Sequence, residues 1–155
     1  MIQRIQSVFL LITAMALTVF LGTNTYIRTL SASESVIVNP YHVQHRIGTL
    51  GTEKPIFYVA VMACIAIVVS VIALFQYRNR LRQILFVAFN ALLMGATLAV
   101  TVYHIVKDAK EVGVGGDETY EVGIFALIVA LLSNSVANYF IKKDEKLVRS
   151  ADRMR

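Results

Sequence analysis

The sequence predicts an all-α membrane protein: an antiparallel bundle of four transmembrane helices, with a short β-prone outer loop and a cytoplasmic extension of the last helix. The first reason is composition. The chain has 155 residues, of which 57% are hydrophobic and 16% are charged, and its mean hydropathy is +0.64. A soluble domain of this length cannot bury so much apolar surface. The second reason is four apolar stretches of about 20 residues, the length of helix that crosses about 30 Å of hydrocarbon.

The predicted spans contain no Asp, Glu, Lys or Arg in their interiors, and they cover residues 5–26, 56–76, 84–106 and 121–141. Arg4 followed by an apolar run also fits a signal peptide. However, the small pair Ala14 and Ala16 lies inside that run, too early for a cleavage site, so we expect an uncleaved anchor. A single membrane domain follows, with outer loops at 27–55 and 107–120, a cytoplasmic loop at 77–83 and a cytoplasmic tail at 142–155.

Basic residues are unevenly distributed between the two sides of these spans. The N-terminus, the loop at 77–83 and the tail carry ten Lys and Arg with three acids. The other side carries five Lys and Arg with seven acids, counting Glu121 at the start of the fourth span. Because short cytoplasmic loops keep an excess of Lys and Arg, both ends of the chain are predicted to lie in the cytoplasm. Topology therefore explains the net charge of +5, and no nucleic-acid partner is expected.

The loops and the tail have weaker signals. Two β-prone runs, 36–38 and 41–47, flank Asn39-Pro40 and predict a short hairpin packed over the bundle. The glycine-rich loop at 107–120 is expected to be a flexible turn. The tail is expected to continue the fourth helix with one apolar face, which can lie on anionic headgroups or dock on a partner.

Polar side chains inside the spans are the best pointers to a site. Asn90, Thr97 and Thr101 share one face of the third span, and Asn134 and Asn138 lie four residues apart in the fourth. Because the depths match, we expect Asn90 to approach Asn134 or Asn138 and to form an interhelical hydrogen bond worth about 0.6 kcal/mol. A ligand site lined by these amides is the alternative.

Three histidines, His42, His45 and His104, fall on the predicted outer side, where with Asp108 they could form a metal or haem site. Three is an ordinary number of histidines, so no metal and no cofactor are predicted. The sequence has no nucleophile constellation, no paired carboxylates within the membrane and one cysteine, Cys64. We therefore expect a protein that is not an enzyme.

The ends of the chain are its most distinctive parts, and they read MIQRIQSV at 1–8 and ANYFIKKDEKLVRSADR at 137–153. Over its whole length the chain resembles an uncharacterised bacterial family of small four-span inner-membrane proteins, filed as domain of unknown function four-two-nine-three. The resemblance implies a bacterial inner membrane and an uncleaved first span, and it offers no catalytic residues. It also suggests that the two ends meet, with Arg4 pairing with Asp144 near Lys142.

These observations favour a non-enzymatic accessory or scaffold subunit of a larger membrane complex, partnered by the lipid bilayer and by another membrane protein or a second copy. The alternative is a small transporter or channel, or a lipid- or quinone-binding protein, whose site is the polar stripe of the third span. A redox protein or metalloenzyme using the outer histidines is a third hypothesis.

Overall fold

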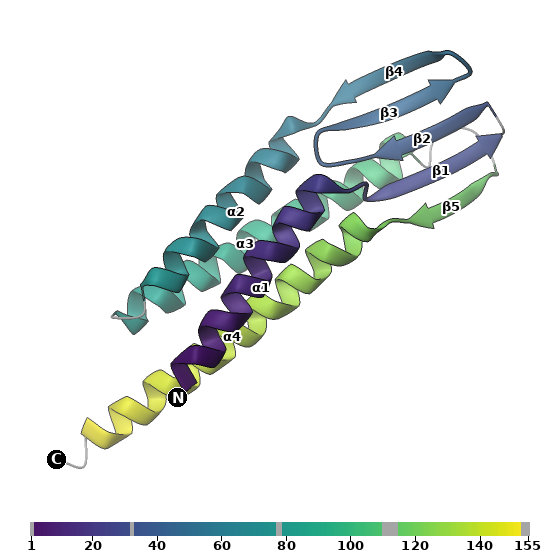
Figure 1. Ribbon diagram of the computed structural model, residues 1–155. Coiled ribbons are helices and arrows are strands. Elements are labelled where there is room, and N and C mark those ends of the chain that lie inside the picture. Colours follow the sequence, from purple (N-terminus) through teal and green to yellow (C-terminus); the bar gives the residue numbers. More distant parts are fainter. Residues whose placement is uncertain (1, 32, 77–78, 110–114, 153–155) are drawn as a thin grey trace.

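The computed structural model describes residues 2–31, 33–76, 79–109 and 115–152, without the side chains of 2–4, 149 and 151–152. Four long helices lie beside one another, and a sheet projects from the end opposite to both termini (Figure 1). We call these two ends of the molecule the sheet end and the tail end.

The helices are α1 (Ile2–Gly22), α2 (Phe57–Phe75), α3 (Arg80–His104) and α4 (Val122–Asp152), and a π-helical turn η1 (Ile105–Ala109) continues α3. All four are long and apolar enough to cross a membrane. α1 and α3 each contact both α2 and α4, so the helices close a ring. The first helix ends earlier than predicted because the chain turns at 23–25 and enters a strand at Tyr26.

The prediction of an all-α fold is wrong, because the chain also forms a five-stranded antiparallel sheet and is therefore an α+β protein. The strands run in the order β4-β3-β2-β1-β5. Their bounds are Tyr26–Ser31 for β1, Glu34–Val38 for β2, His42–Ile47 for β3, Leu50–Pro55 for β4 and Asp117–Tyr120 for β5. The predicted short hairpin corresponds to β2 and β3 alone, and the glycine-rich loop contributes β5.

The strands form because one face of the sheet is apolar with a period of two. Tyr26, Val36, Val38 and Val43 are 5% exposed or less, and the register pairs Tyr26 with Val38 and Val38 with Val43. Asn39 closes the β2–β3 turn by accepting hydrogen bonds from the backbone N–H groups of Tyr41 and His42 at 3.0 and 2.9 Å, as expected of an Asx turn.

Helices and sheet share one hydrophobic core. It runs from Leu17 and Phe20 of α1 through Met94 of α3 to Tyr26 and Val38 of the sheet. The backbone of α4 approaches the α1–β1 link closely: the Gly123 N–H donates to Asn24 O at 2.9 Å, and a Cβ atom added to Gly123 would lie 2.6 Å from that oxygen. The sheet is therefore packed on the helix ends and is not a tethered loop.

Candidate functional site

A chain of polar contacts joins three segments at the sheet end, and we call it the sheet-end cluster; its members are Lys54, Tyr58, His104 and Asp108. The Tyr58 hydroxyl contacts His104 Nε2, His104 Nδ1 lies 2.5 Å from Asp108 Oδ2, and Lys54 Nζ lies 2.7 Å from Asp108 Oδ1. Because a carboxylate accepts, His104 donates from Nδ1 to Asp108. The contacts tie β4, the first turn of α2 and the end of α3 together.

Local structure places the imidazole of this cluster. His104 is the last residue of α3 and is 3% exposed, and Asp108 follows it in η1, a π-helical turn of a kind that is rare and often found at functional positions. The Tyr103 ring meets the imidazole edge-on with ring centres 5.5 Å apart. Asp108 raises the pKa of Lys54 above its usual value, first through their hydrogen bond. The cluster thus holds the His104 ring between a phenol and a carboxylate, and its carboxylate favours the protonated form of an exposed lysine.

Arg28 is a buried arginine that the sequence interpretation counted only as a loop charge. It is 5% exposed, and it donates from Nη1 to Ala109 O at 3.1 Å and from Nη2 to Gly115 O at 2.7 Å. Arg28 alternates with Tyr26 and Leu30 along β1, which puts it on the inner face of the sheet. Its burial could therefore have been predicted from the sequence if the strand itself had been predicted. Arg28 joins β1 to η1 and to the segment that leads into β5.

A second group of polar residues lies between the long apolar helices, and we call it the amide cluster; its members are Ser70, Gln83, Asn90 and Asn134. Asn90 Nδ2 donates to Ser70 Oγ at 2.8 Å and to Asn134 Oδ1 at 3.3 Å. Asn134 Nδ2 donates to Val87 O at 3.0 Å, and Gln83 Nε2 donates to Ala73 O at 3.0 Å. These bonds connect α2, α3 and α4, and sequence reasoning had not placed Ser70 or Gln83 among them.

The other residues proposed for the interhelical contact behave differently. Thr97 and Thr101 are buried, but their hydroxyls donate to Leu93 O and Thr97 O within α3, both at 2.8 Å. Among the described residues, Oδ1 of Asn138 has no hydrogen-bond partner. The structure therefore brings Asn90 together with Asn134 and with Ser70, and it leaves the two threonines bonded to their own helix.

The structure does not bring the three histidines together. His42 Nε2 lies 3.0 Å from Asn39 Nδ2 on one side of β3, His45 Nε2 lies 2.9 Å from Glu34 Oε1, and His104 belongs to the sheet-end cluster. Over the part of the chain that the structure describes, no group of three or more His, Cys, Asp or Glu could hold a metal ion. The geometry thus offers no support for the three-histidine site.

At the tail end, the Arg4 side chain lies outside the described residues, so the predicted ion pair between Arg4 and Asp144 stays a prediction. Asp144 pairs with Arg80: Oδ2 lies 3.2 Å from Arg80 Nη2, and the Asp144 carbonyl oxygen accepts from Nη1 at 3.2 Å. Gln6, which is 4% exposed, donates from Nε2 to Phe140 O at 3.2 Å and joins α1 to α4. Lys142 is exposed on α4.

Comparison with known proteins adds a family without an assigned activity. No curated protein matches the chain. A family model described as Domain of unknown function (DUF4293) matches residues 2–154, which is almost the whole chain and includes both of the distinctive ends. The chain therefore belongs to this family of unknown function, the one that its two ends resemble.

Proposed function

We propose that this chain is a non-enzymatic accessory or scaffold subunit of a larger complex in the bacterial inner membrane. In this arrangement the four apolar helices cross the membrane, both ends lie in the cytoplasm and the sheet lies outside. The four candidate spans and the ten-to-five division of Lys and Arg between the two sides support this placement. The amide cluster supports a structural role for the polar residues at membrane depth, because its donors bind other helices.

The role rests on one observation: a rigidly mounted sheet exposes apolar side chains at its far tip. Ile47 and Leu50 are paired across the β3–β4 hairpin and are 55% and 78% exposed. Arg28 and the sheet-end cluster hold the other end of the sheet on the helices. A surface that is already ordered loses little entropy when it binds, so this tip is suited to docking the outer part of a membrane partner.

The test is recovery of a partner. We would purify the tagged full chain in mild detergent from its native membrane and measure co-purifying proteins by quantitative mass spectrometry. The comparison is between wild type, the double variant Ile47→Ser/Leu50→Ser and the control Glu53→Ser, which changes an exposed polar residue in β4, the strand that begins at Leu50.

A stoichiometric partner, or a second copy seen by native mass, should be present in the wild type and in the control. The double variant should lose it while keeping its melting temperature, because both side chains are exposed. Recovery of the wild-type chain alone and monomeric would refute the accessory role, and equal recovery with the double variant would refute the tip as the docking surface.

One observation favours the alternative, a small transporter or channel, or a lipid- or quinone-binding protein. Asn90 is fully buried, and its Oδ1 has no hydrogen-bond partner among the described residues. Such an oxygen can accept from a hydroxyl-bearing ligand, such as a quinol or a lipid glycerol, or from water in a pore. Mass spectrometry of the wild type and of Asn90→Leu tests this: a ligand retained by the first and lost by the second would favour the alternative.

A further inference from the structure

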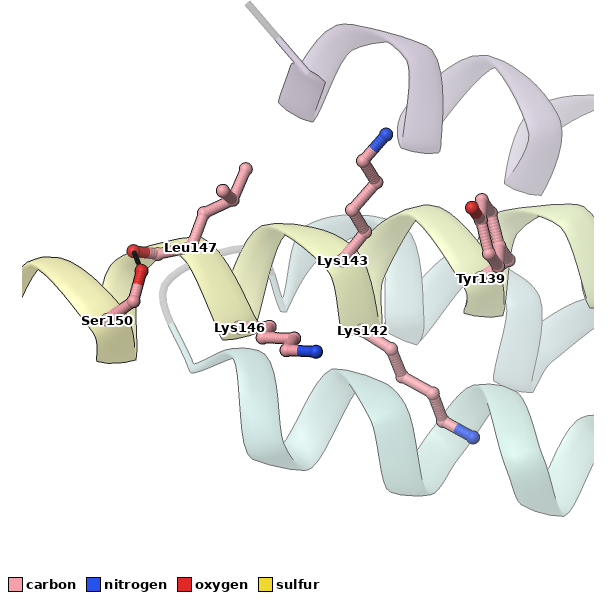
Figure 2. A pocket seen from close by; sticks show the side chains of 6 residues that line it. All are labelled: Tyr139, Lys142, Lys143, Lys146, Leu147 and Ser150. Carbon is pink, nitrogen blue, oxygen red and sulfur yellow. Dashed lines mark hydrogen bonds between the residues drawn. The ribbon is translucent and has the colours of Figure 1, made fainter.

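A shallow groove lies along the exposed face of α4 at the tail end, beyond the apolar part of the helix (Figure 2). Its volume is about 510 Å³, and its lining residues are Tyr139, Lys142, Lys143, Lys146, Leu147 and Ser150. They recur at spacings of three and four, so they occupy one face of the helix. Figure 2 shows the ammonium group of Lys143 on one side of the α4 ribbon and those of Lys142 and Lys146 on the other.

The groove is amphipathic. The Tyr139 ring, Leu147 and the aliphatic stems of the lysines provide apolar surface, while the three ammonium groups provide charge at its margins. A ligand that matches it needs an anionic head and an apolar body.

The groove also continues the lipid-facing surface of α4. Exposed apolar residues follow one another along this surface, at 57% for Phe125, 60% for Leu132 and 62% for Tyr139. From Phe125 to Lys143 a helix rises about 27 Å, close to the thickness of the hydrocarbon layer. An acyl chain packed along this surface would therefore carry its headgroup to the depth of the lysines.

No acidic residue weakens this charge from within the groove, because none of the six lining residues is acidic. Asp144 and Glu145 lie between Lys143 and Lys146 in sequence, but neither lines the groove, and the Asp144 carboxylate contacts Arg80 of α3 at 3.2 Å. A cluster of lysines next to a span attracts anionic headgroups, by about fivefold in affinity for each lysine engaged.

We propose that this groove binds an anionic phospholipid, with the headgroup phosphate held between the lysines at its two margins and the adjoining acyl chain against Tyr139. Lys142 and Lys146 lie on one side of α4 and Lys143 on the other. The proposal rests on the helices crossing a membrane and is independent of the accessory role, so a lipid assay on the isolated chain and partner recovery can fail separately.

Fluorescence quenching tests it, because the chain contains no tryptophan. Tyr139→Trp places a single reporter in the groove of the full chain. The variant is reconstituted in phosphatidylcholine vesicles that contain a fixed minor fraction of brominated phosphatidylglycerol or, in parallel, brominated phosphatidylcholine. The matched control is Phe89→Trp on α3, whose side chain is 54% exposed and reports on lipid at an ordinary helix surface.

We expect the groove reporter to be quenched several-fold more strongly by the brominated phosphatidylglycerol than by the phosphatidylcholine, and the α3 reporter to be quenched equally by both. Replacing Lys142, Lys143 and Lys146 together by Gln should abolish the preference, and replacing them together by Arg should keep it. Both triple variants should keep the wild-type melting temperature, because these lysine side chains are exposed.

Equal quenching of the groove reporter by the two lipids would overturn the proposal, and it is the result expected if the groove serves an acidic protein segment instead. A preference that survives the triple Gln variant would also overturn it, since the lysines would then not be the binding groups.

Discussion

The two polar clusters hold the same chain together with different chemistry. At the sheet end the contacts are ionic: Lys54 and Asp108 lie 2.7 Å apart, and the lysine side chain is 57% exposed. Between the apolar helices the contacts are neutral: Asn90 and Asn134 are fully buried and share an amide hydrogen bond of 3.3 Å. Charged groups occur where water can reach them, and between the helices the chain uses amides and hydroxyls, which cost less to bury.

Arg28 combines a feature of each cluster, because its side chain is charged, as at the sheet end, and almost completely buried, as between the helices. Its guanidinium binds carbonyl oxygens at the junction of sheet and helices. A buried charge is tolerated when its hydrogen bonds are made, and removing it leaves its partners unsatisfied. The junction should therefore depend more on this one side chain than the helix packing depends on any single amide.

The largest effect is expected from Arg28→Met. It removes the charge-assisted hydrogen bonds to the carbonyl oxygens of Ala109 and Gly115 and leaves these oxygens without their donor. We therefore expect a loss of about 3 kcal/mol of unfolding free energy. Thermal unfolding in detergent, followed by circular dichroism, measures it. Arg46→Met is the matched control, because Arg46 is exposed on β3 and its loss should change stability by less than about 0.5 kcal/mol. Equal losses of unfolding free energy in the two variants would mean that Arg28 does not hold the sheet on the helices.

A smaller effect is expected from Asn90→Leu, which removes the bonds to Ser70 and Asn134. Such interhelical hydrogen bonds average about 0.6 kcal/mol and reach at most about 1.7 kcal/mol, so the melting temperature should fall less than in Arg28→Met. Ser135→Leu is the control, since Ser135 is exposed and its hydroxyl donates to Leu131 O within α4. A loss as large as that of Arg28→Met would break the comparison, and unchanged stability would favour the ligand interpretation of Asn90.

The comparison also shows which parts of the structure a single sequence can reveal. The helices follow from composition and length alone. An approach of Asn90 to Asn134 could be proposed because depth in a membrane is set by position along each span. By contrast, β1 pairs with β5 across a large separation in sequence, Tyr26 with Tyr120, and every residue of β4 is exposed. Non-local pairing and an edge strand without alternating burial leave no local pattern.

The same limit applies to individual side chains. Gly95 and Gly123 both lie in stripes of small residues, yet only Gly123 has backbone within 4 Å of an added Cβ atom. Arg28 could not be assigned from sequence because its partners are backbone carbonyls whose positions depend on η1 and on the start of β5. Tyr58 could not be assigned from sequence either, because its contact with His104 depends on the relative rotation of α2 and α3.

The smallest expected effect is a change in how stability depends on pH, and it distinguishes the exposed ion pair of Lys54 and Asp108 from the buried amide cluster. The pKa of Lys54 is raised in the folded protein, first by its hydrogen bond to Asp108. The contact therefore stabilises the fold fully below the unfolded pKa of about 10.5, and this contribution is lost as the pH rises through the folded pKa. Melting curves from pH 8 to about pH 11.5 should show a melting temperature that falls as the pH rises, and falls less steeply in Lys54→Met, which lacks the pair at every pH.

Two control variants complete this test. Lys54→Arg should keep the wild-type melting temperature at neutral pH and should show a smaller fall at alkaline pH, because guanidinium stays protonated throughout this range. The amide cluster has no titrating group, so Asn90→Leu should lower the whole curve without changing its slope. An identical alkaline slope in wild type, Lys54→Met and Lys54→Arg would mean that the ion pair contributes nothing to mounting the sheet, and that Arg28 and the shared core hold it alone.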